Sequence, residues 1–483
     1  MTSLAMPDHE PRFGRRRWEG RAWAKAIYNA SPWYLQNMLV SAYGLVLHRY
    51  ATSSRVQQYL SQLIQSQWLT PEELVALQSC KLRVLIEHAY NNVPYYREVL
   101  DDLHLKPGHI QKPADLQKLP LLSKQDVRQN LDRLIARNVD PRKLHRRPTS
   151  GTTGTPLLVY QSDTNEASER ALWLRLRGWA GWQPGEKRAT FFGYMVVPPE
   201  RREPPLWRYD RPERRLLCSV YHMARENVGL YLDKLREYQP KVIEGYPSYL
   251  SFLALHLERA GQKLPVHAIF TYSETLYPHQ RRLIEDRFAC KIFDWYGLTE
   301  KVASAVQCGY TDGYHVNAEK TIVEIIKPDG TPAAPGEYGE IVGTNLDEYG
   351  MPLLRYRSGD VSAYRPATCA CGRGLPLIEQ VQTRVDDIIT TPDGRLINPA
   401  PLAGLFRQPT IEKARIIQQE LDQVEVLIVA APGYAEADSE PIERGIRAVL
   451  GPEVNISVKL VEDIPCTASG KYPFIVSKVP LKV

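Results

Sequence analysis

The chain has no apolar run long enough to cross a membrane and no pattern of a secretory leader. Near its start the longest mostly apolar run is residues 38–47, well short of the about 20 residues that a membrane-spanning helix needs. Residues 1–30 are polar and rich in arginine, without an apolar core before a small-residue cleavage site. We therefore expect no transmembrane segment and a cytoplasmic protein, in which the seven cysteines serve as thiols or metal ligands before disulfides.

The chain also lacks a charge excess, an internal repeat and any low-complexity tract. Its 61 Lys and Arg residues against 55 Asp and Glu residues give a net charge of only +6, which argues against a nucleic-acid partner. At 483 residues, with 43% hydrophobic and 24% charged residues, the chain can form two or three soluble domains with full cores. The composition leaves the oligomeric state open, a homodimer included.

Helical patterns dominate the N-terminal part of the sequence. A Ser-Pro pair suited to a helix start predicts a helix over roughly 32–50, expected to pack on the core or to dock. A membrane-surface role for it is the less favoured alternative, because no strong polar face opposes the apolar one. Residues 56–137 continue in helical segments punctuated by proline, with Ser123 as an expected cap. The sequence assigns no role to this helical N-terminal extension, residues 1–137.

Helix and strand patterns then alternate three times. Helical periods at 227–238, 247–260 and 278–287 precede the strand-like segments KVIEGY, HAIFTYS and KIFDWYG. This alternation is typical of a parallel, doubly wound sheet. The Pro/Arg-rich residues 198–215 before it are expected to form a solvated surface loop.

The pattern changes after residue 300. Short β runs with Gly and Pro turns predict a β-barrel-like region at about 316–383. In the last hundred residues two antiparallel strands, a helix near 436–450 and a further strand predict a small α+β domain. The expected fold class is therefore α/β. A large N-terminal domain, residues 1–383, has doubly wound, mostly parallel sheets, and a small mobile C-terminal α+β domain comprises residues 384–483.

One loop consists of small hydroxyl residues, glycine and proline. Residues 149–156 read TSGTTGTP, and an apolar run follows them. Such a loop exposes backbone N–H groups and hydroxyl donors, which together form a cradle for an anion. It lacks the Gly-Lys-Ser/Thr ending of a P-loop, so that chemistry is disfavoured. Taken alone, the loop is equally well explained as a flexible turn.

Three further segments favour the anion cradle. YGLTE, residues 296–300, closes the third strand of the alternating sheet, where such folds bind ligands. YRSGD, residues 356–360, offers a carboxylate after a glycine turn, suited to a ribose diol. TASGKYP, residues 467–473, is a second hydroxyl/glycine loop and contains a lysine. In this order and spacing the four segments resemble the adenylate-forming superfamily of acyl-CoA ligases and adenylation domains.

Other segments resemble one branch of that superfamily. LRVLIEHAYNNVPYYREVL, LPLLSKQDVRQN and CACGRGLPLI are similar to the phenylacetate–CoA ligase branch, with its CapK-like and coenzyme F390 synthetase-like proteins. The resemblance implies that a carboxylic acid and Mg-ATP give an acyl-adenylate and pyrophosphate, after which an acceptor, usually coenzyme A, takes the acyl group. Two alternatives stay open: an adenylyltransferase that moves AMP to a hydroxyl acceptor, as F390 synthetase-like relatives do, and a non-catalytic scaffold.

The resemblance also implies roles for individual residues. The β- and γ-phosphates would be surrounded by the hydroxyl loop, which comprises Thr149, Ser150, Gly151, Thr152, Thr153, Gly154 and Thr155. Tyr296 and Gly297 would lie at the adenine, and Asp360 would bind the ribose hydroxyls. Arg384 would lie near the phosphates. The catalytic residues would be Thr299 at the α-phosphate, Glu300 as the Mg²⁺ ligand and Lys471 between the carboxylate and the α-phosphate. Because Lys471 lies in the small domain, that domain must close for adenylation and rotate afterwards, with Asp386 as the expected hinge.

The acyl pocket is expected at the ends of two strands, where the resembling family lines it. The candidates are Tyr246, Pro247, Tyr272, Ser273 and Glu274. An aromatic lining favours an aryl or arylacetic acid as the substrate, although aromatic residues at strand ends are more often part of the core.

Four residues form a candidate metal set. Cys308 and His315 lie seven positions apart, and Cys369 and Cys371 share one tight turn. Three thiolates and one imidazole are a structural Zn²⁺ set, and such sites are built from two close pairs brought together across a β region. The alternative is buried free cysteine, which is common. We expect a closed, non-catalytic zinc site, and the same pairs occur in the resembling branch.

Overall fold

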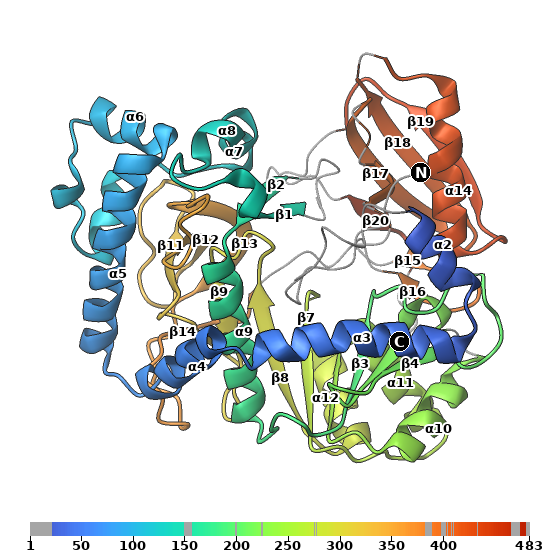
Figure 1. Ribbon diagram of the computed structural model, residues 1–483. Helices are drawn as coiled ribbons and strands as arrows, with labels where there is room; N and C mark the ends of the chain where they lie inside the picture. Colours follow the sequence, from blue (N-terminus) through green and yellow to red (C-terminus); the bar gives the residue numbers. More distant parts are fainter. Residues whose placement is uncertain are drawn as a thin grey trace.

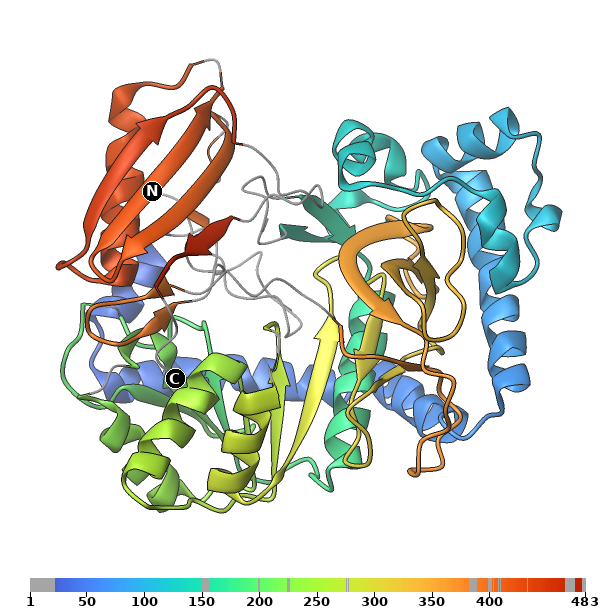
Figure 2. The same cartoon turned by 180° about the vertical axis from the view of Figure 1, so that it is seen from behind.

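The computed structural model describes residues 22–479 except for residues 149–156, 199, 224–225, 275, 277, 382–388, 398–401, 403, 407, 409, 432 and 465–473. The described residues form a large α/β part, an antiparallel sheet beside it and a C-terminal α+β unit (Figures 1 and 2). No helix in the described part of the chain is both long and apolar enough to cross a membrane.

Helices form the N-terminal part, as the sequence pattern predicts. They are α2 (Ala22–Ala30), α3 (Trp33–Ala51), α4 (Ser54–Ser66), α5 (Pro71–Asn92), α6 (Pro94–Asp102), α7 (Lys124–Gln129) and α8 (Leu131–Leu134). Helix α5 begins with a reciprocal cap, in which the Glu73 N–H donates to the Thr70 hydroxyl and the Thr70 N–H donates to the Glu73 carboxylate. Ser123 and Asp126 cap α7 in the same way, which confirms the predicted cap.

A nine-stranded mixed sheet carries the large part, in the order β14-β10-β9-β8-β7-β6-β3-β5-β4. Its strands are β3 (Arg188–Phe192), β4 (Trp207–Asp210), β5 (Arg215–Ser219), β6 (Val242–Gly245), β7 (Ala268–Tyr272), β8 (Lys291–Gly297), β9 (Ser304–Val306), β10 (Tyr314–Val316) and β14 (Leu377–Ile378). The neighbours from β8 to β5 run parallel, and the strands outside them pair antiparallel. The predicted parallel core is confirmed.

Helices cover both faces of this sheet (Figures 1 and 2). They are α3 and α9 (Asp163–Trp179) on one face, and α10 (Val228–Tyr238), α11 (Pro247–Arg259) and α12 (Pro278–Phe288) on the other. The last three precede β6, β7 and β8, which confirms the three predicted helix–strand repeats. Fully buried side chains such as Phe191, Ile243 and Phe270 belong to the apolar core that forms here.

The expectation of a solvated loop at 198–215 is wrong, because this stretch contains β4 and reaches β5 at the edge of the sheet. The Arg208 side chain is fully buried, and its Nε donates to Gln36 Oε1 of α3 at 2.7 Å. Arg215 is also buried and pairs with Asp210 at 3.3 Å. The Gln36 amide oxygen accepts from Arg208 and the Asp210 carboxylate offsets the charge of Arg215, so the composition of the segment is a poor guide to its burial.

The region after the large sheet contains a three-stranded antiparallel sheet in the order β11-β12-β13. Its strands are β11 (Thr321–Ile326), β12 (Tyr338–Asn345) and β13 (Tyr356–Ala363). The barrel-like closure expected at 316–383 is not confirmed. A hairpin of β1 (His145–Pro148) and β2 (Leu158–Gln161) lies beside this sheet in both views (Figures 1 and 2). Val159 of the hairpin and Tyr356 of β13 share one apolar cluster.

The C-terminal part is an α+β unit with its own apolar core and the sheet order β19-β18-β17-β20. Its elements are β15 (Ile389–Thr390), β16 (Leu396–Ile397), β17 (Ile411–Glu420), β18 (Gln423–Ala430), α14 (Ser439–Leu450), β19 (Asn455–Leu460) and β20 (Ile475–Ser477). Ile416, Ile428 and Ile446 are fully buried in it. The predicted antiparallel strand pair, helix and further strand are confirmed. The expected boundary at 383/384 lies outside the described residues, and mobility of the unit stays a prediction.

Candidate active site

The carboxyl ends of the parallel strands meet at one edge of the large sheet. Strands β6, β7 and β8 pair in register as far as Gly245, Tyr272 and Trp295. The ends of these strands and the segments that follow them therefore lie side by side. Together they contain the acyl candidates and the YGLTE motif, whose Tyr296 and Gly297 are the last two residues of β8. Open parallel sheets bind their ligands at this edge.

Tyr296 and Asp360 lie together although 64 residues separate them, and the Tyr296 hydroxyl donates to Asp360 Oδ2 at 3.0 Å. Asp360 follows Gly359, whose φ of +80° lies in the left-handed region that favours glycine. The Asp360 N–H also donates to Ser358 Oγ at 3.0 Å, which fixes the turn. Burial, and then the Asp360 charge, raise the pKa of Tyr296 well above its ordinary value, so the phenol stays a donor.

Glu300 is buried directly after β8, with 7% of the residue exposed. The Tyr356 hydroxyl donates to Glu300 Oε1 at 2.7 Å, which joins the YGLTE and YRSGD motifs. Burial, and then the Glu300 charge, raise the pKa of Tyr356 well above its ordinary value, so this phenol also stays protonated. Lys301, the next residue, pairs with Glu166 and thus leaves Glu300 to the phenol.

The predicted anion cradle connects the two strands of the β1–β2 hairpin. Pro148 pairs with Leu158, so the two strands are paired at the end that adjoins the loop sequence. The cradle residues Thr149, Ser150, Gly151, Thr152, Thr153, Gly154 and Thr155 themselves lie outside the described residues. Gln161, the last residue of β2, donates through Nε2 to the Thr299 carbonyl at 2.6 Å. This hydrogen bond ties the hairpin to the YGLTE segment.

A buried ion triad, which the sequence analysis did not identify, joins the same two segments. Glu166 Oε1 accepts from Arg147 Nη2 and from Lys301 Nζ, each at 2.9 Å. Burial alone would raise the pKa of Glu166, but Lys301 and Arg147 outweigh it and hold this pKa far below its ordinary value. Arg147 precedes the hydroxyl loop and Lys301 follows Glu300. These charged residues beside the two motifs were the sequence feature from which the triad could have been predicted.

The aromatic acyl candidates pack against one another and against the core. Between ring centroids, Tyr272 lies 4.2 Å from Phe192 and 4.8 Å from Trp173, and Tyr246 lies 5.4 Å from Phe192. Both tyrosines are buried. Burial, and then the Glu274 charge, raise the pKa of Tyr246 well above its ordinary value. The aromatic side chains therefore form a packed wall behind the sheet edge.

The remaining acyl candidates differ in exposure. Pro247 begins α11 and is buried, whereas Ser273 is exposed and Glu274 is half-buried. Ser273 has a φ of +71°, in the left-handed region. A non-glycine residue there is strained, and such residues cluster at functional sites. Ser273 and Glu274 are the candidates that bring polar groups to the edge.

Three predicted residues, Lys471, Arg384 and Asp386, lie outside the described residues. The described part of the C-terminal unit contacts the large part through Arg395, whose Nη1 donates to the Tyr221 carbonyl at 3.1 Å. The same guanidinium donates to the last two carbonyls of α14, at 2.8 and 2.6 Å. Closure of this unit over the site stays a prediction.

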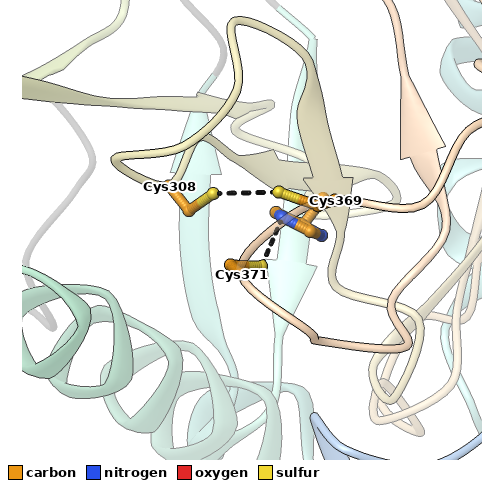
Figure 3. Close-up of side chains that lie close together, drawn as sticks. Cys308, Cys369 and Cys371 are labelled. Atoms are coloured by element: carbon orange, nitrogen blue, oxygen red, sulfur yellow. Dashed lines mark hydrogen bonds between the residues drawn. The ribbon is translucent and has the colours of Figure 1, made fainter.

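The four predicted metal ligands lie together. The sulfur atoms of Cys308 and Cys369 are 3.5 Å apart, and Cys371 Sγ lies 3.4 Å from His315 Nε2 (Figure 3). All four ligand atoms lie within 4.8 Å of one another. His315 Nδ1 lies 3.4 Å from the Leu375 carbonyl, a contact that orients the ring as second partners of ligating histidines do. Three sulfur atoms and one imidazole nitrogen at these distances are the kind of donor set that holds structural zinc.

Comparisons with known proteins identify the family. The chain is 31% identical to a phenylacetate–coenzyme A ligase of Escherichia coli (strain K12) over 330 residues, which are 66% of this chain and 72% of the relative. The protein belongs to the phenylacetate–coenzyme A ligase family. It is also 24% identical over 470 residues to Protein CapK of Staphylococcus aureus, covering 94% of this chain and 99% of that protein. Residues 389–478 match the CapK C-terminal domain.

Solved structures agree on the fold of this phenylacetate–coenzyme A ligase family member. A 2-hydroxyisobutyryl-CoA ligase in complex with 2-HIB-AMP and CoA has a TM-score of 0.56 at 19% identity, over 85% of this chain and 91% of that chain. The same ligase in its postadenylation state has a TM-score of 0.52 at 18% identity, over 85% of this chain and 90% of that chain. The fold is that of adenylate-forming ligases, and by its family the chain is an AMP-forming acid–thiol ligase.

Proposed function

We propose that the protein activates an aryl or arylacetic acid with Mg-ATP as an acyl-adenylate and transfers the acyl group to coenzyme A. The observation that carries this proposal is the convergence of the Tyr296–Asp360 pair and the Tyr356–Glu300 pair with the hydroxyl-loop hairpin. Relatives named as phenylacetate–coenzyme A ligases, and a structural neighbour that holds 2-HIB-AMP and CoA, support both halves of the reaction.

In this proposal the nucleotide lies across the two motifs. Asp360 accepts hydrogen bonds from two ribose hydroxyls, because a carboxylate has acceptor sites for both, and the Tyr296 phenol orients it. Tyr296 and Gly297 lie against the adenine, and Thr299 lies at the α-phosphate. The loop from Thr149 to Thr155 surrounds the β- and γ-phosphates with N–H and hydroxyl donors.

Glu300 is the residue that we propose for Mg²⁺. Its carboxylate is buried and accepts from a neutral phenol, while the neighbouring Lys301 pairs with Glu166. The buried carboxylate offers oxygen ligands, and an oxygen-seeking cation is a fitting partner for them. A metal ion bound there supplies charge neutralisation at the phosphates.

The acid would lie against the aromatic wall. The buried Tyr246 and Tyr272, together with Pro247 at the start of α11, offer an apolar boundary that suits an aromatic ring. Ser273 and Glu274, at the strained turn after β7, offer polar groups at the rim. Relatives that are phenylacetate–coenzyme A ligases support an arylacetic acid over a short aliphatic one.

Residues 384–483 act as the lid in this proposal, and residues 1–383 carry the nucleotide and acyl sites. Lys471 offsets charge between the carboxylate and the α-phosphate when the lid is closed. Arg384 lies near the phosphates, and Asp386 is the hinge about which the lid turns between the two half-reactions. The match of residues 389–478 to the CapK C-terminal domain supports a separate unit here.

We further propose that Cys308, His315, Cys369 and Cys371 hold a structural Zn²⁺. The mutual approach of four ligand atoms within 4.8 Å supports it. With all four positions filled by protein, such a site leaves no place for substrate, so its role is to hold its β segments together.

The deciding experiment is ATP–pyrophosphate exchange with a panel of aryl, arylacetic and aliphatic acids, followed by product mass with and without coenzyme A. We expect exchange with an aryl or arylacetic acid and an acyl-CoA product. Glu300→Gln should lower this exchange at least roughly tenfold, because it removes the charge of the metal ligand. If no acid supports exchange and a phenolic acceptor becomes AMP-labelled, the protein is an adenylyltransferase instead.

A further inference from the structure

Helix α3 carries apolar side chains on two opposite faces. Its inner face is buried against the fold and includes Gly44, Leu47 and Ala51. Its outer face, here called the outer stripe, consists of side chains that are 40–66% exposed: Tyr34, Leu35, Met38, Leu45 and Val46. These positions recur at the spacings of one helical face, so the stripe is continuous along the helix. Exposed apolar patches of this kind mark interaction surfaces.

The inner face fixes α3 in place, so the outer stripe is a stable surface. The Tyr209 N–H of β4 donates to Asn37 Oδ1 at 2.9 Å, and Ser41 Oγ donates to the Tyr209 carbonyl at 3.1 Å. A Cβ at Gly44 would clash with the Asp210 carboxylate, which shows how closely helix and strand approach. Figure 1 shows α3 in the foreground, lying across the sheet.

The sequence around the outer stripe contains no acid. Between residues 21 and 71 there is no Asp or Glu, in a chain that has 55 of them among 483 residues. The Lys and Arg residues of this stretch are Arg21, Lys25, Arg49 and Arg55. Of these, Arg49 of α3 and Arg55 of α4 are described and exposed. Apolar exposure and positive charge therefore coincide in one stretch of the chain.

We propose that the outer stripe, extended by the exposed Ile27 and Trp33, docks the protein on an anionic lipid bilayer. A helix lying in the membrane interface inserts apolar side chains at headgroup depth, while basic residues contact the lipid phosphates. Trp and Tyr suit this boundary because each combines an apolar ring with a polar atom. The contact is peripheral, since no described helix is able to cross a membrane.

A second copy of the chain is the rival occupant of this face. A two-fold contact would bring two acid-free, basic segments against each other, and like charges at close range repel. Anionic headgroups carry the complementary charge. The charge pattern therefore favours lipid over self-association, whereas apolar area alone would suit either.

The experiment is flotation of the full-length protein with lipid vesicles. The probes are vesicles of phosphatidylcholine alone and vesicles with about 30 mol% phosphatidylglycerol. We expect partition onto the anionic vesicles to exceed partition onto the neutral ones by roughly tenfold or more. About 0.5 M NaCl should reduce the difference, because it screens the charges.

A matched pair of variants separates the outer stripe from general surface effects. Met38→Glu with Leu45→Glu places two acids in the stripe and should lower partition onto anionic vesicles by roughly tenfold or more. The control, Val75→Glu with Val84→Glu, changes two apolar residues of α5 that are 47% and 53% exposed. It should bind like the unmodified chain. Both variants should keep their thermal unfolding temperature and solution pyrophosphate exchange.

Three results would overturn the proposal. The first is equal partition of the unmodified chain onto neutral and anionic vesicles. The second is undiminished binding by the Met38→Glu, Leu45→Glu variant. In the third, the unmodified chain elutes as a dimer and this variant as a monomer, with no vesicle binding by either; the stripe is then a self-association surface.

Discussion

Two tyrosine–carboxylate pairs organise the site at the level of single residues. Tyr356 donates to Glu300 at 2.7 Å, and Tyr296 donates to Asp360 at 3.0 Å. Because burial raises the pKa of both phenols, each remains a neutral donor. A neutral donor orients a carboxylate without cancelling its charge, so both carboxylates stay suited to a cation or to hydroxyl donors.

The first prediction concerns the Tyr356 hydroxyl. Tyr356→Phe should lower acid-dependent pyrophosphate exchange about tenfold and raise the Mg²⁺ concentration for half-maximal rate, because Glu300 loses the hydrogen bond that orients it. Exchange measured across a magnesium titration tests this. The control is Tyr364→Phe, whose hydroxyl donates to the Val323 carbonyl at 2.5 Å, away from both carboxylates. An equal loss in both variants, or an unchanged magnesium requirement for Tyr356→Phe, would contradict the proposed role of Glu300.

At the level of elements, α9 connects three parts of the molecule through buried ion pairs. Its Glu166 binds the hydroxyl-loop hairpin through Arg147. In the same helix, Arg175 pairs with Glu319 at 2.5 Å. Arg177 pairs with Glu244 of β6 at 2.6 Å. Buried charges are costly unless they are paired, so these contacts fix where the helix lies relative to the sheets.

The second prediction is that Glu244 of β6 makes the stability of the fold depend on pH in the acid range. Burial alone would raise the pKa of Glu244, but Arg177 and Arg188 outweigh it and lower this pKa to about 2, against an ordinary 4.5. A carboxyl group whose pKa is lower in the folded than in the unfolded state stabilises the fold at pH values above its unfolded-state pKa. This contribution is lost as the pH falls from about 4.5 towards 2.

Glu244→Gln tests this directly. It should lower the free energy of unfolding near neutral pH by about 3 kcal/mol, because buried Arg177 and Arg188 each lose a charge partner, although Arg188 keeps Glu213 at 2.8 Å. It should also flatten the pH dependence of stability across the acid range. Urea unfolding at a series of pH values measures both effects. Glu440→Gln, which changes an exposed pair with Arg444, should cost less than about 0.5 kcal/mol. Similar acid profiles for the unmodified chain and Glu244→Gln would contradict the assignment.

At the scale of the whole molecule, the four candidate metal ligands come from segments that are distant in the sequence. Cys308 follows β9, His315 lies in β10, and Cys369 and Cys371 come from the loop before β14. A bound ion would therefore cross-link one end of the nine-stranded sheet.

The third prediction is that chelator-washed protein contains about one zinc per chain by elemental analysis. Cys371→Ser should reduce the content below about half and lower the thermal unfolding temperature, because a ligand is lost. Cys290→Ser, which changes a partly buried cysteine outside the cluster, should keep the zinc. A content below about half a zinc in the unmodified chain would mean that the four residues are a metal-free cluster.

The fourth prediction separates the two half-reactions. Lys471→Ala should lower adenylation roughly a hundredfold or more, the effect of removing one transition-state charge contact. Supplied with preformed acyl-adenylate, this variant should still transfer the acyl group. Asp386→Pro should keep pyrophosphate exchange and lose transfer, because a fixed φ resists rotation of the lid. Equal loss of both half-reactions in both variants would show that one conformation serves the whole cycle.

Whole-molecule contacts also explain where sequence reasoning about the site was incomplete. It placed Glu300 and Asp360 in one site by resemblance, but it identified neither the Tyr356 hydrogen bond nor the Glu166 triad. Glu166 and Lys301 are separated by 135 residues, and only the folded chain brings them to 2.9 Å. Tyr246 and Tyr272 lie at the strand ends where the sequence places them, but their packing against Phe192 and Trp173 was not visible in the sequence.

The sequence by itself determined the helix–strand alternation, the C-terminal α+β elements, the Ser123 cap and the residues of the four motifs. These follow from periodicity and from chemistry within a few positions, which are local properties of the chain. The tertiary structure decided the burial of Arg208 and Arg215 and the apolar exposure of α3. Burial of a charge depends on partners such as Gln36, which lie far away in the sequence, and an apolar helix has a core face and a free face only once its neighbours are in place.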